Sequence, residues 1–227
     1  LWESENPSLV IPFVEKLNDD PSDDVRAAAA SALGAFVLLG ETQGLPQDRL
    51  KLIEDALLDV YQTTENGLLH RNCLDSLGYS SREEVNELIL TAFESDDETL
   101  VRSSIIAMGR SANQRWKDFV LTHLLSPSPQ LRLASVVAVG ELEVKEALEE
   151  ILELIDDVDI KIRNASVWSL SQIGGSRAAD ILAELFNAAE DGEELQLLED
   201  AFDNLAFVDG TRDMLIFDHD DEEESAS

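Results

Sequence analysis

A ten-residue frame that recurs along the chain is the feature that most constrains the fold. Its copies begin at Val25, Leu69, Leu100, Leu131, Ile162 and Leu197. The third, fourth and fifth copies read LVRSSIIAMG, LRLASVVAVG and IRNASVWSLS, and each starts 31 residues after the one before. A fixed period of about 20 to 50 residues is typical of an array, in which each unit buries its apolar face against its neighbours.

The spacing within the frame predicts an α-helix. The first and ninth columns are apolar in every copy, and the fifth and eighth columns are mostly Ala or Ser. Because each residue advances about 100° around an α-helix, these columns lie on one face. We expect the small residues on that face to let neighbouring helices approach closely.

A second helical pattern precedes each frame in the same register, so each unit is an αα-hairpin. Its apolar positions are Val85, Trp116, Ala147 and Ala178, then Ile89, Val120, Ile151 and Leu182, then Phe93, Leu124, Ile155 and Phe186. The predicted fold is therefore all-α, a solenoid of about six hairpins. The second helices are predicted near residues 23–39, 67–79, 98–111, 129–142, 160–174 and 194–207.

The solenoid is predicted to occupy residues 1–208 and to be followed by an acidic, disordered tail, residues 209–227. Leu1 and Trp2 match the end of a frame, which predicts that the chain begins inside a repeat whose first part is missing. Two spacings depart from 31. The distance from Val25 to Leu69 is 44 residues, with part of the excess expected as a loop near 40–47, and that from Ile162 to Leu197 is 35.

The charge of the chain limits its partners. Its 48 acidic and 16 basic residues give a formal net charge of −32. A field of that sign repels phosphate backbones and anionic lipids, so nucleic acid and membranes are disfavoured as partners. A basic protein partner is favoured on this ground. The alternative, that the acidic residues only keep the solenoid soluble, stays open.

The single cysteine, Cys73, excludes an internal disulfide framework. It occupies the small fifth column of the frame, which predicts a buried position. No apolar stretch reaches the roughly 18 residues that a membrane span needs, and no signal peptide is visible, so the predicted location is cytoplasmic.

The frames VRAAAASALG and LRLASVVAVG, each preceded by an acidic turn and a helix, resemble HEAT-like repeats of the short class named after phycobilisome lyases. The resemblance covers about residues 1–208. It implies a right-handed solenoid whose second helices line the concave side, with a ladder between second-column arginines and the acidic turns. Arg26, Arg132 and Arg163 match that column, whereas His70, Val101 and Leu198 depart from it, so we expect an interrupted ladder.

Three activities known among such proteins can be compared with these residues. Deoxyhypusine hydroxylases of this class bind iron through His-Glu dyads, and none of His70, His123 and His219 is followed by Glu. Alkylpurine DNA glycosylases need a basic groove, which this composition does not supply. Phycobilin lyases act on a tetrapyrrole of a partner protein, and no chromophore-binding motif is matched here.

The sequence offers no clustered nucleophile and base, no phosphate loop and no metal-ligand spacing. We therefore expect no catalytic residues, no metal and no cofactor, and predict that the protein is not an enzyme. His123 shares a column with apolar residues, so a packed or half-buried histidine is favoured over a ligand. His219 lies among aspartates in the predicted tail.

The seventh column of the frame points away from the predicted core and carries the candidate binding residues. It is polar in the end copies and apolar in the middle ones, where it holds Ile106, Val137 and Trp168, and Leu133 lies one turn from Val137. A contiguous apolar patch rimmed by charge is typical of a binding site, and Trp168 is its natural anchor. The alternative is that neighbouring second helices bury this column between them.

These observations predict a scaffold that binds a protein partner on its concave face through Ile106, Leu133, Val137 and Trp168, and the net charge favours a basic partner. One alternative is an auxiliary or lyase-like subunit that acts on a tetrapyrrole or another prosthetic group of a partner protein. Another is that the chain is only the structural arm of a longer protein.

Overall fold

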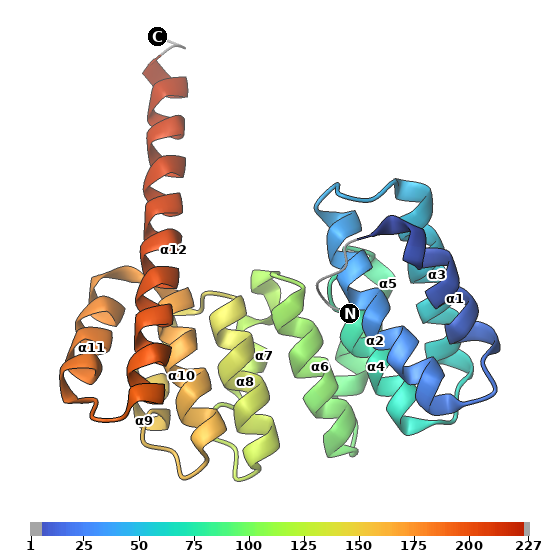
Figure 1. Cartoon of the computed structure of the whole chain (residues 1–227), viewed down its shortest axis with the longest axis horizontal. Helices are drawn as coiled ribbons and strands as arrows, with labels where there is room; N and C mark the ends of the chain where they lie inside the picture. Colours follow the sequence, from blue (N-terminus) through green and yellow to red (C-terminus); the bar gives the residue numbers. More distant parts are fainter. Residues whose placement is uncertain (1–5, 225–227) are drawn as a thin grey trace. The chain divides into compact units, whose positions relative to one another are not determined.

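The computed structural model describes the backbone of residues 6–224 and the side chains of residues 6–210. This part of the chain contains twelve α-helices and three short 3-10 helices, and no strand (Figure 1). The prediction of an all-α solenoid of hairpin repeats is confirmed. None of the described helices is both long enough and apolar enough to cross a membrane.

The chain divides into two compact units, Leu1–Val120 and Leu121–Ser227, which are described separately. The helices of the N-terminal unit are η1 (Pro7–Leu9), α1 (Val10–Asp19), α2 (Asp23–Glu41), α3 (Gln47–Thr63), α4 (Gly67–Leu77), α5 (Glu83–Phe93), α6 (Glu98–Arg110) and η2 (Gln114–Trp116). The division falls within α7 (Lys117–Leu121). In this unit α2 packs against α1, α3 and α4, and α6 packs against α4 and α5.

The C-terminal unit repeats the same arrangement. Its helices are α8 (Pro129–Glu141), η3 (Lys145–Ala147), α9 (Leu148–Leu154), α10 (Ile160–Ile173), α11 (Gly175–Ala188) and α12 (Gly192–Glu224). Helix α10 contacts α8, α9, α11 and α12, and α11 also contacts α12. The second helices of successive hairpins therefore pack side by side, α8 on α10 and α10 on α12.

The small eighth and tenth columns of the frame make the contact between successive second helices. The Ser169 hydroxyl of α10 donates a hydrogen bond to the Val136 carbonyl of α8, at 2.6 Å, and Ser76 of α4 bonds the Ala30 carbonyl of α2 in the same way, at 2.8 Å. A Cβ added to Gly140 would lie 3.0 Å from the Cα of Ser169. The close approach of α8 and α10 therefore depends on the absence of a side chain at Gly140.

The columns assigned to the core are largely buried. Every residue of the fifth and ninth columns is buried, and so are the first eight apolar positions of the preceding helices, from Val85 to Leu182. The first column is less uniform, because Val25 is 40% exposed.

Side chains at the N-terminal ends of several second helices cap those helices. Asparagine, aspartate and serine side chains accept hydrogen bonds from the first-turn amides: Asn66 of α4, Asp97 of α6, Ser128 of α8 and Asp159 of α10.

The irregular spacings have different structural causes. The excess between the first two frames lies mostly in helix, since α2 has 19 residues and α3 has 17, and only Thr42–Pro46 separates them. The turn between α11 and α12, residues 189–191, is shorter than the turn between α9 and α10, residues 155–159. The four extra residues near the C-terminus therefore lie in the end of α11 and the start of α12, and not in the turn where the sequence placed them. Helix α12 continues to Glu224 and so includes most of the stretch predicted as a disordered tail. Residues 225–227, and the Leu1-Trp2 match to a frame end, lie outside the described residues.

Candidate functional site

Two large apolar side chains are exposed next to each other on the second helices of the C-terminal unit. Val137 of α8 is 38% exposed, and Trp168 of α10 is 40% exposed. Their neighbours in the chain, Val136 and Ser169, are buried and joined by the hydrogen bond described above. Val137 and Trp168 therefore flank the same contact between two packed helices. Leu133, one turn before Val137, is half-buried.

The structure thus brings three of the four predicted binding residues to one surface, which we call the apolar face: Leu133, Val137 and Trp168. The fourth, Ile106, is half-buried on α6 and belongs to the N-terminal unit. The alternative prediction, in which adjacent helices bury the seventh column completely, does not describe Val137 or Trp168, because each keeps more than a third of its surface exposed.

Sequence reasoning missed an exposed apolar residue of α12, Phe207, which is 73% exposed. It lies four residues after Asp203, and Asp203 is the seventh-column residue of the last frame. Residues four apart share a helix face, so Phe207 extends the line of the seventh column by one turn. The frame ends before position 207, and an eleventh column would have included it.

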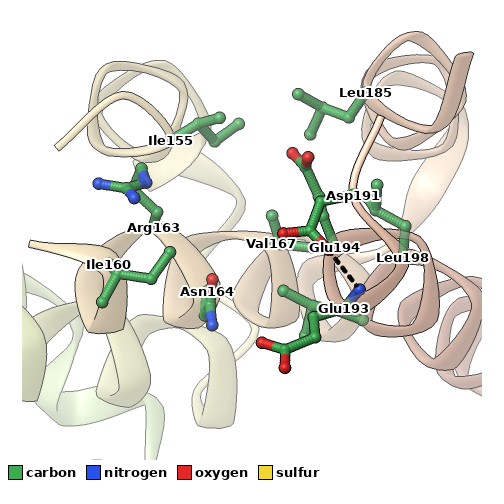
Figure 2. Close-up of a pocket in the computed structure, with 11 residues that line it drawn as sticks. Ile155, Ile160, Arg163, Asn164, Val167, Leu185, Asp191, Glu193, Glu194 and Leu198 are labelled. Atoms are coloured by element: carbon green, nitrogen blue, oxygen red, sulfur yellow. Dashed lines mark hydrogen bonds between the residues drawn. The ribbon is translucent and has the colours of Figure 1, made fainter. Parts of the chain in front are cut away.

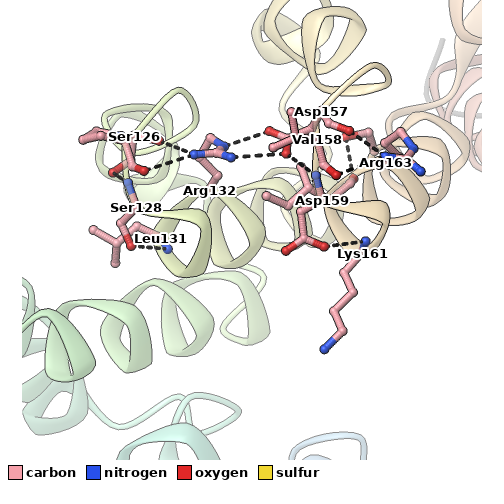
Figure 3. A network of polar contacts seen from close by, with 12 residues as sticks. Ser126, Ser128, Leu131, Arg132, Asp157, Val158, Asp159, Lys161 and Arg163 are labelled. Atoms are coloured by element: carbon pink, nitrogen blue, oxygen red, sulfur yellow. Dashed lines mark hydrogen bonds and ion pairs between the residues drawn. The ribbon is translucent and has the colours of Figure 1, made fainter.

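An arginine and an aspartate join two successive repeats in the C-terminal unit (Figure 3). Arg132 of α8 donates to both carboxylate oxygens of Asp157, from Nε to Oδ2 at 2.9 Å and from Nη2 to Oδ1 at 3.2 Å. Its Nη1 also donates to the Ser126 carbonyl at 2.8 Å. Both side chains of the ion pair are largely buried. This pair is one step of the arginine ladder that the family resemblance implies.

The environment of Asp157 favours its ionised form. Burial alone would raise the pKa of this carboxyl. The hydrogen bonds from Arg132 and from the Asp159 amide, together with the charges of Arg132 and Arg163, outweigh burial and hold the pKa below its ordinary value. The Asp159 amide lies 2.8 Å from Oδ1 of Asp157. The carboxylate therefore both fixes the turn before α10 and binds α8 through Arg132.

The other arginines of the column contact their own repeats. Arg163 of α10 donates through Nη1 to the Asp157 carbonyl at 2.7 Å and to the Val158 carbonyl at 3.4 Å. Arg26 of α2 donates to the Leu17 carbonyl at 2.9 Å and pairs with Asp23. Leu198, which replaces arginine in the last frame, is buried. The ladder is therefore interrupted, as the sequence predicted.

A pocket of about 290 Å³ opens in the C-terminal unit between α10 and the start of α12 (Figure 2). We call it the α10–α12 pocket. Its apolar wall consists of Ile155, Ile160, Val167, Leu185, Leu197 and Leu198. Its polar residues are Arg163, Asn164, Asp191, Glu193 and Glu194. In Figure 2, Arg163 lies on one side of the pocket, and Asp191 and Glu194 lie on the other.

A second polar cluster, in the N-terminal unit, surrounds a buried carboxylate. Glu54 of α3 is 5% exposed and accepts a hydrogen bond from the Ser80 hydroxyl. Burial raises the pKa of Glu54, and the Ser80 hydrogen bond and the Arg82 charge oppose that shift without cancelling it. Arg82 also pairs with Asp55, at 2.6 Å, and with Glu84. The cluster fixes the segment before α5 against α3.

The remaining reactive side chains include a stacked pair of rings and a buried thiol. His70 stacks on Tyr61 with ring centroids 4.0 Å apart, and burial lowers the pKa of both His70 and His123. The thiol of Cys73 is fully buried. Within the part of the chain that the structure describes, no three His, Cys, Asp or Glu side chains are grouped to hold a metal ion. His219 lies outside the described side chains.

Two family models match the sequence. The model for HEAT repeats matches residues 118–202, and that for a single HEAT repeat matches residues 10–39. Together the two stretches make up just over half of the chain. The chain is a HEAT-repeat protein. A search of curated protein sequences found no relative that matches it.

Solved structures resemble these HEAT repeats in fold. A chain of the complex of CpcE and CpcF of phycocyanin lyase from Nostoc sp. PCC7120 has a TM-score of 0.57 and 16% identity, over 90% of this chain and 77% of that one. A designed armadillo repeat protein in complex with the peptide (KR)4 has a TM-score of 0.49 and 16% identity, over 89% of this chain and 100% of that one. An engineered protein gives 0.49 and 14%, over 88% and 97% of the two chains. At such low identity these likenesses concern the fold alone.

Proposed function

We propose that this protein is a non-enzymatic scaffold that binds a protein partner through the apolar face of its C-terminal unit. The observation that carries the proposal is the exposure of Trp168 beside Val137 on two packed second helices. Tryptophan is among the residues most enriched in binding hot spots, and an exposed indole next to exposed aliphatic carbon provides a contiguous area for a partner to cover.

The residues around the apolar face favour a basic partner. On α12, the exposed positions in line with the seventh column include Glu199 and Asp203, and Asp200 lies beside them. Carboxylates at the rim of an apolar surface attract a cationic partner and orient it during association.

The polar clusters at Arg132 and Glu54 join repeats and segments through hydrogen bonds, which is a structural role and fits a scaffold.

The test is the replacement of Trp168 by Ala. A partner is first captured from the source organism with the wild-type chain, identified by mass spectrometry and purified, and its affinity is measured by calorimetry. We expect W168A to weaken binding by about 2 kcal/mol or more, as at other aromatic hot spots. The control is D180A, which removes an exposed side chain from α11 outside the apolar face and its acidic rim.

Stability must be followed in the same variants. Because Trp168 is partly exposed, W168A should cost roughly 1 to 2 kcal/mol of unfolding free energy, less than the roughly 3 to 5 kcal/mol typical of a fully buried Trp. Unchanged affinity in the folded W168A protein, together with a large loss of stability, would assign Trp168 to packing and refute the proposal.

The alternative function is an auxiliary or lyase-like subunit that acts on a tetrapyrrole or another prosthetic group of a partner protein. What supports it is the likeness in fold to the CpcE and CpcF complex. Adding a bilin to the purified protein and recording visible absorption separates the two functions. A red-shifted, stoichiometric bilin spectrum would favour the lyase-like alternative, whereas an unchanged spectrum favours the scaffold.

A further inference from the structure

The α10–α12 pocket lies where the next step of the arginine ladder is missing. Between α8 and α10, Arg132 extends to Asp157 in the turn of the following repeat. Arg163 occupies the same column one repeat later, but no ion pair in the described part of the chain joins it to Asp191, Glu193 or Glu194. The four extra residues of this repeat lengthen the end of α11 and the start of α12, on either side of the turn that holds Asp191. The pocket occupies the space between Arg163 and them.

The lining of the pocket combines an apolar wall with an excess of negative charge. Val167 and Leu198 are buried, and Ile155 and Leu185 are half-buried. Three carboxylates and a single guanidinium line the pocket, and Nη1 of that guanidinium already donates to two carbonyls of its own turn. The lining therefore carries more negative than positive charge, in a chain whose formal net charge is −32.

Asp191 is already placed by the fold. Its Oδ1 accepts a hydrogen bond from the Glu193 amide at 2.9 Å, which caps the first turn of α12. Its second carboxylate oxygen has no hydrogen bond among those described. Figure 2 shows Asp191 and Glu194 together on the α12 side of the pocket, opposite Arg163. A cation that enters from solvent would therefore meet two carboxylates next to an apolar wall.

This combination selects one kind of occupant. A lysine or arginine side chain has a long aliphatic stem, which can lie on apolar surface, and a cationic head, which needs carboxylates. An anion in the pocket would be repelled by the three carboxylates of the lining. A purely apolar group would remove water from those carboxylates without replacing its hydrogen bonds, which is unfavourable.

We propose that the α10–α12 pocket binds a lysine or arginine side chain of the protein partner. The inference rests on the proposed function, because the pocket opens beside the apolar face. Asn164 lines the pocket and lies on α10 one turn before Trp168. One turn of an α-helix rises about 5.4 Å. A single partner segment can therefore place an apolar residue on Trp168 and a basic residue in the pocket.

The pocket can be tested without knowing the partner, with n-butylguanidinium as a probe for an arginine side chain and n-butylammonium for lysine. Each is titrated into isotope-labelled protein, and the amide resonances of Asn164, Glu193 and Glu194 are followed. We expect shifts that saturate with one dissociation constant for at least one of the two cations. n-Butanol, which has the same stem without the charge, should produce no saturable shift at these residues.

The variant that tests the assignment is D191N/E194Q. Asparagine at position 191 keeps an oxygen that can cap α12, so the fold is retained. We expect cation affinity to fall by about tenfold, because two carboxylates at a partly exposed site are lost. The matched control, D180N/E184Q, removes two exposed charges from α11 outside the pocket and should leave the affinity unchanged.

Two results would overturn the proposal. One is a cation titration that does not saturate or that is equally weakened by both double variants, which would indicate general attraction to an acidic surface. The other is a saturable shift with butyrate, which would assign the pocket to an anion held by Arg163. Because W168A is measured with the partner and D191N/E194Q with the butyl probes, failure of the apolar face and failure of the pocket are distinguished.

Discussion

Arg132 and Asp157 form a paired, two-bond contact between successive repeats, with Nε–Oδ2 and Nη2–Oδ1 distances of 2.9 and 3.2 Å. Paired hydrogen bonds between a guanidinium and a carboxylate fix orientation as well as distance. Arg132 also bonds a carbonyl at the end of its own preceding turn, and Asp157 accepts the amide of Asp159. The pair therefore sets how the hairpin that contains α10 lies on α8, the two helices that carry Val137 and Trp168.

Replacing Arg132 by Ala should lower the free energy of unfolding by roughly 2 to 4 kcal/mol, because it leaves a largely buried carboxylate without its cation. Denaturant unfolding followed by circular dichroism measures this loss. The control is R177A, which removes the same charge from an exposed position on α11 and should change stability by less than about 0.5 kcal/mol. Equal effects of the two substitutions would contradict a specific role for the pair.

The pair also predicts a dependence of stability on pH. The pKa of Asp157 is held below its ordinary value in the folded state. The stability that this provides is therefore fully present above the unfolded pKa, near 4, and is lost as pH falls through the folded pKa. Wild type should be more stable than D157N at pH 7, and the difference should shrink below about pH 4. A difference independent of pH would show that the charge of Asp157 contributes nothing.

Glu54 predicts the opposite sign. Burial raises the pKa of this carboxyl, so its contribution to stability is present below the unfolded pKa and is lost as pH rises through the folded pKa. Relative to wild type, E54Q should gain stability as pH rises from 4 to 7, as thermal melts at several pH values would show. E84Q, which changes an exposed partner of Arg82, is the control and should lack this trend.

The repeat period predicted the helices and the core because both follow from local periodicity. Helix α10, for example, begins at Ile160 and ends at Ile173, and the expected range was 160–174. The small eighth column also predicted close packing, which the contact between Ser169 and Val136 provides. The apolar and small columns recur in successive copies of the frame, so a single sequence shows the same pattern several times.

The parts that could not be predicted are those that do not repeat. The α10–α12 pocket lies beside the four extra residues of the last repeat, and its lining comes from α10, α11, α12 and the turns that precede α10 and α12. Exposure of Trp168 depends on how far α8 and α12 cover it, which the pattern of one helix does not define. The Glu54 cluster joins α3 to the segment before α5, a contact specific to the lengthened second repeat.

The buried cysteine provides a test of the core. Burial raises the pKa of the Cys73 thiol to about 12, so almost none of it is thiolate at pH 8. Reaction with a chromogenic disulfide reagent should be at least about 100-fold slower in the native protein than in guanidinium, because the thiol must first be exposed by opening of the fold. Rapid native reaction would contradict the burial of the fifth column.

Gly140 tests whether the spacing between α8 and α10 controls the apolar face. A Cβ at this position would lie 2.8 Å from Oγ and 3.0 Å from Cα of Ser169, and it would also contact Gln172. A glutamine side chain can move, but the backbone of α10 cannot move without shifting the helix. Alanine gains up to about 1 kcal/mol over glycine within a helix, whereas overpacking a close contact costs about 1 to 3 kcal/mol.

G140A should therefore lose roughly 1 to 2 kcal/mol of unfolding free energy, since overpacking outweighs the gain in helix propensity. G210A is the matched control, because no atom lies within 4 Å of a Cβ at that position, and it should keep or raise stability. The shift of α8 away from α10 also separates Val137 from Trp168. G140A should consequently weaken partner binding in the folded protein, and G210A should not. If G140A behaved like G210A in both measurements, α8 and α10 would not be held together by the glycine contact.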